Sequence, residues 1–189
     1  MEEKQNAVLG TAPLGKLMVK FALPCTISLL VGALYNIVDQ IFIGWGVGYL
    51  GNGATNVVFP LTVLALGIAV MIGDGACSYV SICFGKGQAE NANRAVGSAV
   101  TLSVLVGVVV AALYGVFQTP ILGMFGATEA NFAYAKEYFT YITIGIPIYV
   151  FGQAINPIIR SDGSPQFAML SMLAGAIANC ILDPIAIFV

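Results

Sequence analysis

Long apolar runs separated by short polar segments dominate the chain. Five runs carry no charged residue and are each close to or longer than the ~20 residues that a helix needs to cross a bilayer. They cover residues 21–38, 40–73, 95–128, 138–159 and 163–182. The pattern predicts an all-α fold with transmembrane helices at about residues 21–43, 55–84, 95–117, 134–159 and 166–189, behind a polar lead-in at residues 1–20.

Composition agrees with a multi-pass membrane protein. Of the 189 residues, 59% are hydrophobic and 8% are charged, whereas soluble domains carry about 25% charged residues. The net charge of -2 without a basic tract gives no support to nucleic-acid binding, so the expected partner is the lipid bilayer. Histidine is absent, which excludes imidazole catalysis and imidazole metal sites. We therefore expect neither an enzyme nor a bound cofactor.

The basic residues predict the orientation in the membrane. With a cytoplasmic N-terminus, six of the seven Lys and Arg residues fall on the cytoplasmic side and only Lys136 falls outside. The positive-inside rule therefore favours an N-terminus inside. The sequence stops at Val189 within apolar residues, although a helix is not expected to end unflanked in lipid. We expect these residues to be the front part of a longer protein.

Two acids interrupt the apolar helices at one depth. Asp39 lies 19 residues after Lys20, and Asp183 lies 21 residues after Asp162. At 1.5 Å per residue, both carboxylates reach the outer half of the membrane, with the geometry to face each other. Each acid follows the same polar series at helical spacing: Ser28, Gly32 and Asn36 in the first helix, and Ser171, Gly175 and Asn179 in the last. The glycines are expected to allow close approach of the helices.

This pairing predicts a cation-coupled site. A charge inside a membrane segment costs ~3 kcal/mol on insertion scales, so such acids are candidate functional residues. Two adjacent carboxylates cannot both stay ionised without a cation, so the pair takes a proton or binds a metal ion. The amide oxygens of Asn36 and Asn179 add hard-oxygen ligands suited to Na⁺. The alternative interpretation is that Asp39 and Asp183 are interfacial carboxylates within reach of water.

Other positions in the spans have alternative explanations. Asp74 in the second helix is either a gating residue or a water-reachable acid toward the cytoplasmic half. Asn156 lies near the inner end of the fourth helix, where capping or packing explains it. Pro24 and Gly32 are candidate bending points of the first helix. Small residues recur every fourth position from Ala95 to Gly115, which we assign to helix packing.

Four segments together resemble one transporter family. They are PLGKLMVKFALPCTISLLVGALYNIVDQIFIG near the N-terminus, GDGACSYVSICFGKGQAENANRAV, IIRSDGSPQFAM and NCILDP. In this order they resemble the multidrug and toxic compound extrusion (MATE) transporters of the MOP superfamily. The resemblance implies twelve helices in two six-helix lobes, of which this chain supplies five in the N-terminal lobe. The second lobe, which is required for transport, is absent from these residues.

The resemblance also implies roles for individual residues. In this family an N-lobe cation site includes an Asp on the first helix and an Asn and an Asp on the fifth, which match Asp39, Asn179 and Asp183. Tyr138 and Asn156 match further polar positions of the lobe. The implied function is antiport of small amphipathic, often cationic, organic compounds against Na⁺ or H⁺ by alternating access. The implied location is the plasma or inner membrane.

Three other functions remain open at this point. The first is a lipid or polysaccharide-precursor flippase of the same superfamily, which should carry more cationic residues in its spans. The second is an intramembrane aspartyl protease, but the segment from Met71 to Asp74 lacks the first glycine of a G-x-G-D signature. The third is a half-unit that transports only when it assembles with another chain.

Overall fold

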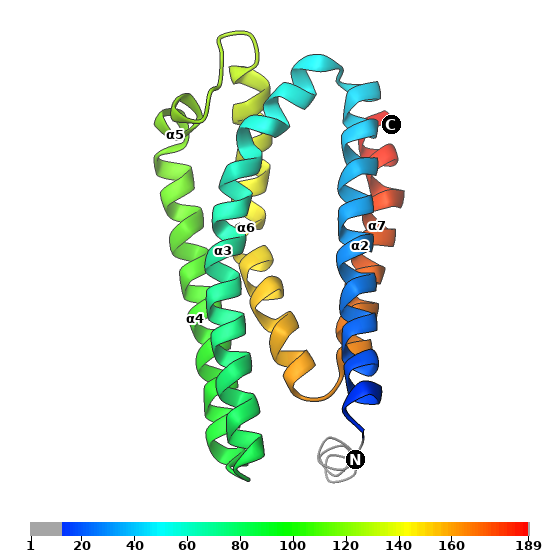
Figure 1. The fold of residues 1–189 in the computed structure, drawn as a ribbon. Helices are drawn as coiled ribbons and strands as arrows, with labels where there is room; N and C mark the ends of the chain where they lie inside the picture. The colour runs from blue at the N-terminus through cyan, green and yellow to red at the C-terminus, as the bar shows by residue number, and fades with distance from the viewer. Residues whose placement is uncertain (1–12, 189) are drawn as a thin grey trace. The chain divides into compact units, whose positions relative to one another are not determined.

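Helices are the only regular secondary structure in the part of the chain that the structure describes. The computed structural model describes residues 13–188, with side chains as far as residue 185 (Figure 1). The helices in this part are α2 (Leu14–Gly46), α3 (Tyr49–Gly85), α4 (Ala89–Val116), α5 (Gln118–Met124), α6 (Phe132–Ser161) and α7 (Pro165–Phe188). All except the short α5 are long and apolar enough to cross a membrane. The predicted all-α membrane fold with five spans is confirmed.

The helices extend further than hydropathy predicted. Helix α2 begins at Leu14, so Lys16 and Lys20 lie on the helix and not in a polar lead-in, while residues 1–12 lie outside the described residues. Its other end reaches Gly46, and the predicted loop shrinks to a tight turn in which Gly48 has a φ of 79°. Hydropathy marks only the part at membrane depth, and nothing at these ends breaks the helix. A left-handed φ at Gly48 is a conformation that glycine adopts without strain.

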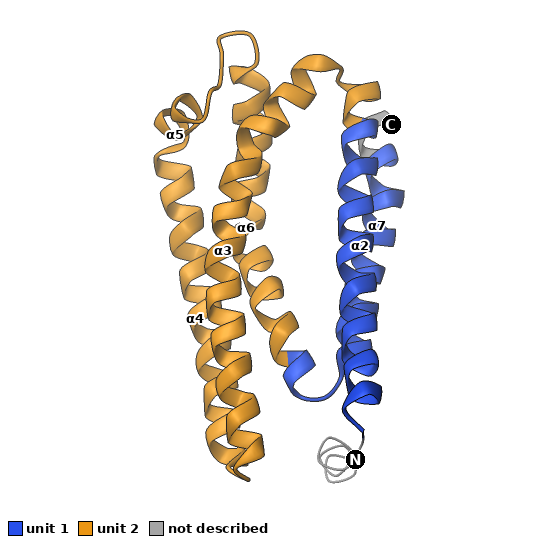
Figure 2. Ribbon diagram, in the orientation of Figure 1, with its two compact units in different colours: residues 1–42, 159–189 blue, residues 43–158 orange. Residues whose placement is uncertain are grey.

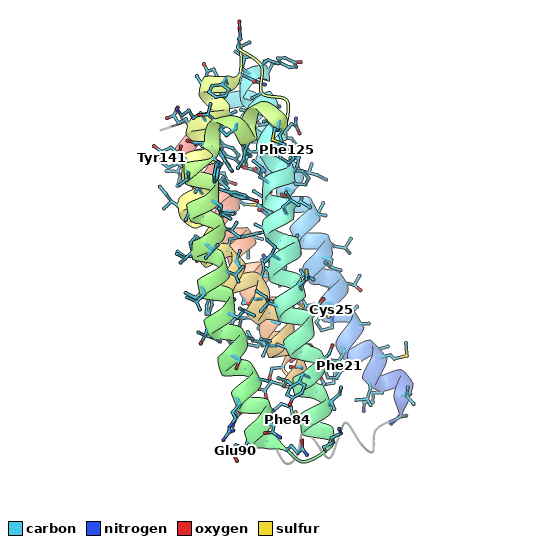
Figure 3. The ribbon with its side chains drawn as sticks, turned by 90° about the vertical axis from the view of Figure 1, so that its left-hand side faces the viewer. Phe21, Cys25, Phe84, Glu90, Phe125 and Tyr141 are labelled. Carbon is cyan, nitrogen blue, oxygen red and sulfur yellow. The ribbon has the colours of Figure 1, made fainter. Side chains whose placement is uncertain are left out.

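The turn between α3 and α4 is equally short. Helix α4 begins at Ala89, within the polar segment 85–94 that was predicted to be a loop. The side chain of Arg94 donates a 2.7 Å hydrogen bond to Glu90 one turn earlier, and such i,i+4 pairs support an exposed first turn. Figure 3 shows Phe84 and Glu90 at one end of this hairpin, and Phe125 and Tyr141 toward its other end. Helix α4 therefore begins in polar residues, before the apolar run that predicted it.

The chain divides into two compact units (Figure 2). Unit 1 contains Met1–Phe42 and Ile159–Val189, and so holds most of α2 together with α7. Unit 2 contains Ile43–Ile158, and so holds α3, α4, α5 and most of α6. The first and last spans of the sequence therefore come together in one unit, as the two predicted acid positions require.

Unit 2 is built on an apolar core shared by its helices. One cluster joins α3, α5 and α6 through Ala54, Val57, Val58, Leu61, Leu122, Ala135 and Phe139. A second joins α3, α4 and α6 through Ala65, Ala69, Val110, Ile146 and Val150. Tyr114 of α4 connects the two, because its ring lies 5.3 Å from that of Phe139 and its hydroxyl donates a 2.8 Å hydrogen bond to the Leu61 carbonyl. That bond satisfies a polar group which would otherwise be buried alone.

Close helix approach occurs at two glycines of unit 2. A Cβ on Gly73 of α3 would lie 2.6 Å from the Ala154 carbonyl oxygen of α6, and one on Gly107 of α4 would lie 2.9 Å from the Pro147 Cα. Gly107 belongs to the predicted small-residue stripe, and packing is confirmed at Gly107 but not at Gly115, where an added Cβ would meet nothing within 4 Å. The same expectation is wrong for Gly32 and Gly175, where an added Cβ would meet nothing within 4 Å. Glycine spacing permits close approach but does not say which face packs.

Both units expose large apolar side chains along their spans. Leu29 on α2 is 68% exposed, and Ile144 and Ile148 on α6 are 71% and 77% exposed. A soluble protein rarely exposes so much contiguous apolar surface, whereas lipid requires it. These side chains therefore indicate faces that contact lipid or another apolar partner.

Candidate functional site

The two predicted acids lie in the same unit on different helices. Asp39 is on α2, about two turns before the helix ends at Gly46, and Asp183 is on α7. Both side chains are half-buried. They lie close enough for Asp183 to act electrostatically on Asp39. The structure thus brings together the pair that residue counting had placed at one depth.

A third residue joins this pair. Tyr35 lies four residues before Asp39 on α2, is half-buried, and is influenced electrostatically by both Asp39 and Asp183. Sequence reasoning missed Tyr35, because a tyrosine in an apolar helix is usually a packing residue. The signal available was its spacing, since residues four apart share one face of a helix. Its hydroxyl adds a hydrogen-bond donor and acceptor beside two carboxylates.

The two asparagines lie at the side of the acids. Asn36 and Asn179 are both exposed, unlike Asp39 and Asp183. The Asn36 amide donates a 2.7 Å hydrogen bond to the Gly32 carbonyl of its own helix. This bond uses the amide nitrogen and leaves the side-chain oxygen to act as a ligand. Asn179 lies one turn before Asp183, so its amide lies on the adjacent, more exposed strip of α7.

The serines of the predicted polar series are occupied within their own helices. Ser28 is 1% exposed and donates a 2.9 Å hydrogen bond to the Pro24 carbonyl. Ser171 is exposed and donates a 2.8 Å hydrogen bond to the Ala168 carbonyl. Bonds to the preceding turn are the usual arrangement for serine in a membrane helix. The series therefore runs along the helices without placing its serines at the acids.

The candidate bending points of α2 lie within one continuous helix. Pro24 is buried, and α2 runs through both Pro24 and Gly32 from Leu14 to Gly46. Proline removes one helical hydrogen bond, and glycine leaves the backbone less restricted. A Cβ on Gly32 would meet nothing within 4 Å, so there is open space beside the helix at that position. Their role in bending stays a prediction.

Three further predicted residues lie in unit 2. Asp74 is exposed on α3, and its backbone carbonyl accepts a 2.8 Å hydrogen bond from the Ser78 hydroxyl. Tyr138 and Asn156 are half-buried on α6. They are 18 positions apart on one helix, which corresponds to about 27 Å along its axis. These two residues therefore occupy different depths and do not form one small site together.

The chemistry of the acid pair suits a hard monovalent cation or a proton. Carboxylate and amide oxygens are the ligands that hard cations such as Na⁺ accept. In the part of the chain that the structure describes, no three His, Cys, Asp or Glu side chains gather as a transition-metal site would require. The donors present at Asp39, Asp183, Asn36 and Asn179 are all oxygens. They fit Na⁺ or a shared proton better than a soft metal.

Comparison with known proteins places the chain in a family. A family model described as MatE matches residues 24–185. The FAD transporter of Shewanella oneidensis is 28% identical over 185 residues, which are 98% of this chain and 41% of that protein. The multidrug export protein MepA of Staphylococcus aureus is 26% identical over 188 residues, covering 42% of its length. The chain thus spans about two fifths of the length of these relatives.

Solved structures agree with the sequence relatives. The MATE multidrug transporter DinF-BH, in complex with rhodamine 6G, has a TM-score of 0.88 and 36% identity, over 95% of this chain and 40% of that one. A MOP superfamily transporter from Pyrococcus furiosus, described by a reverse polarity of its binding pocket that suggests a different function, has a TM-score of 0.84 and 29% identity, over 90% and 38% of the two chains. With a family match across both acids and nearly all of the described helices, this chain belongs to the MatE family of multi-pass membrane transporters.

Proposed function

We propose that the protein is part of a cation-coupled antiporter that exports amphipathic organic compounds. The observation that carries this proposal is that Asp183 on α7 lies near enough to act electrostatically on Asp39 on α2. Two acids that interact inside apolar helices hold a positive charge far more readily than they stay jointly ionised. Binding and release of that charge from one side or the other is what ion coupling requires.

The coupling ion is Na⁺ or H⁺, and it acts by changing the balance between two conformations. A cation shifts a conformational equilibrium only when it binds one state more tightly than the other. Neutralising Asp39 and Asp183 removes their mutual repulsion and so favours closer approach of α2 and α7. Pro24 and Gly32 give α2 places to bend in response. In this mechanism the bound ion and the organic substrate favour opposite states, which produces alternating access.

Charge favours cationic substrates over anionic ones. Away from the helix ends the spans carry three acids, Asp39, Asp74 and Asp183, whereas the sequence has no Lys or Arg between Lys20 and Lys86 or after Arg160. Acidic groups in a low-dielectric wall attract cationic compounds and repel anionic ones. The relatives MepA and DinF-BH are described as multidrug transporters, and DinF-BH is in complex with rhodamine 6G, which is a cationic dye. The same absence of basic residues weighs against a flippase for anionic lipid or polysaccharide precursors.

A second candidate function is export of an anionic cofactor. The FAD transporter of Shewanella oneidensis matches 98% of this chain, and FAD carries negatively charged phosphates. The reverse pocket polarity described for the Pyrococcus furiosus transporter likewise indicates that substrate charge varies among related proteins. This function would need basic residues from outside residues 21–85 and 161–189. Competition between the cationic dye rhodamine 6G and FAD for transport separates the two substrate classes.

The decisive experiment replaces each acid singly by its amide. We expect Asp39→Asn and Asp183→Asn to insert normally in the membrane but to lose ion-driven efflux of rhodamine 6G from vesicles. Glu137→Gln is the matched control, because it removes an exposed acid of α6 in unit 2. Separate Na⁺ and H⁺ gradients identify the coupling ion. Efflux at the wild-type rate in both Asp39→Asn and Asp183→Asn would rule out the proposed site.

The same proposal includes the membrane and the orientation. Efflux to the outside requires the plasma or inner membrane, and the distribution of basic residues favours a cytoplasmic N-terminus. Lys4, one of the residues counted for this orientation, lies outside the described residues. Lys16, Lys20, Lys86, Arg94 and Arg160 lie at helix ends or in the turns of the described part.

A further inference from the structure

Helix α7 contains a proline directly after its acid. Pro184 lies inside α7, which continues to Phe188. Proline has no backbone N–H, and its ring pushes against the carbonyl of the residue four positions earlier. The carbonyl of Cys180 therefore loses the donor that an α-helix would give it at position 184. In a membrane span such a freed carbonyl is satisfied by a neighbouring group, by an ordered water or by a local change in the helical hydrogen bonds. A cation held beside the carbonyl is one such neighbouring group.

The released carbonyl lies on the same face as the acid. Cys180, Asp183 and Pro184 are half-buried, whereas Ile181 and Leu182 are each 57% exposed. Side chains on a helix lean toward its N-terminus, so the Asp183 carboxylate extends back over the turn that contains Cys180. A carboxylate and a backbone carbonyl are thus directed to one place on α7. Asp39 interacts electrostatically with this carboxylate from α2.

Two carboxylates and one backbone carbonyl that are directed to the same place favour a bound positive charge. The carboxylates of Asp39 and Asp183 already repel each other in low dielectric. The Cys180 carbonyl oxygen has lost its helical donor, and its partial negative charge adds to this repulsion. A hard cation relieves both costs, because carboxylate and backbone carbonyl oxygens are its preferred ligands. A proton held on Asp183 does the same by donating a hydrogen bond to the carbonyl.

We propose that the backbone carbonyl of Cys180, released by Pro184, is an oxygen ligand for the positive charge held between Asp39 and Asp183. That charge is Na⁺ or the acidic proton of the pair, and the carbonyl serves either in the same way. The inference rests on the proposed function, since it adds a ligand to the proposed site. It assigns Pro184 the role of positioning residue, which acts through the Cys180 carbonyl. The titratable side chains of these turns are Tyr35 and Asp39 on α2, and Cys180 and Asp183 on α7.

The test restores the missing donor. Pro184→Ala supplies an N–H that closes the helical bond to the Cys180 carbonyl and withdraws it from the site. We expect equilibrium binding of ²²Na⁺ by the purified protein to weaken by about tenfold, the effect of losing one hydrogen-bond-sized interaction with a charged group. In a proton-coupled protein, the same loss appears as a shifted pH dependence of efflux. Pro60→Ala on α3 is the matched control, because its released carbonyl lies in unit 2.

A backbone ester separates the carbonyl from the shape of the helix. The α-hydroxy analogue of alanine, incorporated at position 184, lacks the proline ring but also lacks the N–H. We expect it to retain wild-type binding, because the Cys180 carbonyl stays released. If the loss in Pro184→Ala came from a straighter helix, the ester would share the defect, and that result would overturn the proposal.

An infrared measurement observes the carbonyl itself. Replacing Cys25, Cys77 and Cys83 by serine or alanine leaves Cys180 as the single cysteine, whose carbonyl is then labelled with ¹³C. We expect its band to shift when Na⁺ is added at fixed pH, or when the pH is lowered without Na⁺, and we expect no such shift in Pro184→Ala. A shift on adding Na⁺ identifies Na⁺ as the bound ion, and a shift on lowering the pH identifies a proton. A band insensitive to both ions overturns the proposal.

The outcomes distinguish this inference from the function on which it rests. If Asp39→Asn and Asp183→Asn lose cation binding and efflux while Pro184→Ala behaves as wild type, the carbonyl is not a ligand and the proposed function stands. If both aspartate variants bind and transport normally, the proposed site and the carbonyl ligand fail together.

Discussion

At the residue scale, position along a helix proved more informative than residue type. Asp39 and Asp183 were paired from the sequence because each lies a similar number of residues beyond a polar end, and in the structure Asp183 acts electrostatically on Asp39. Tyr35 was missed because only the structure shows which of the many tyrosines faces the acids. The exposure of Asn179 could not be predicted either, since residue spacing alone does not show how α7 is rotated about its axis.

Tyr35 gives a prediction at this scale. Tyr35→Phe removes the hydroxyl that both carboxylates influence electrostatically and keeps the half-buried ring on α2. We expect half-saturation of efflux by the coupling ion to require about fivefold more ion, because the variant lacks the hydroxyl that can donate a hydrogen bond to a carboxylate, an interaction with a net worth of ~1 kcal/mol. The measurement is rhodamine 6G efflux against Na⁺ concentration or pH. Tyr141→Phe on the exposed face of α6 is the control, and equal behaviour of the two variants would contradict the role of Tyr35.

Tyr114 gives a second prediction, which concerns stability. Its hydroxyl donates a hydrogen bond to the Leu61 carbonyl between α4 and α3. We expect Tyr114→Phe to destabilise the protein by about 1 kcal/mol, because the half-buried ring is retained and one hydrogen bond is lost. Thermal unfolding in detergent measures the change. A variant as stable as wild type would mean that the bond contributes nothing net to the fold.

At the element scale, the number and order of helices were predictable, but their ends were not. Apolar runs locate the part of each helix that lies in lipid, and α2 and α4 nevertheless continue into polar residues at Lys16 and Glu90. Packing was predicted only in part. The small-residue stripe marked a true contact at Gly107, whereas Gly32 and Gly175 have open space beside them. Which face of a helix packs depends on its partners, and those lie far away in the sequence.

The two packed glycines of unit 2 predict a stability difference. A methyl group at Gly73 or Gly107 would collide with the α6 backbone at Ala154 or Pro147. We expect Gly73→Ala and Gly107→Ala to lower the free energy of unfolding by about 1–3 kcal/mol, the usual cost of overpacking. Gly67→Ala is the control, since a Cβ there would meet nothing within 4 Å. Fluorescence-detected gel filtration after heating ranks the variants.

The control variant Gly67→Ala is expected to change the free energy of unfolding in the opposite direction. An exposed helical glycine loses more backbone freedom than alanine on folding, so Gly67→Ala should be neutral or stabilising by up to ~1 kcal/mol. If all three alanine variants had the same stability, the close contacts at Gly73 and Gly107 would not hold α6 against α3 and α4.

At the scale of the whole molecule, the order of the spans and the unequal distribution of charge favour one topology in the membrane. If α2, α3, α4, α6 and α7 cross in alternating directions, the turn after α3 and the turn after α6 face the same side as the N-terminus. Lys86, Arg94 and Arg160 lie at or next to those two turns, and Lys136 lies by the segment after α4. Because basic residues are retained on the cytoplasmic side, we expect the N-terminus to be cytoplasmic.

Cysteine labelling tests that orientation. In a background without the four native cysteines, Gln88→Cys places a thiol in the turn after α3, and Glu129→Cys places one in the segment between α5 and α6; both positions are exposed. We expect a membrane-impermeant maleimide to label Glu129→Cys in intact cells, and Gln88→Cys only after the cells are opened. The reverse pattern would invert the topology and put Asp39 and Asp183 in the cytoplasmic half. Labelling of both thiols in intact cells would indicate insertion in two orientations, and then counting Lys and Arg would not explain how the acid pair meets the outside.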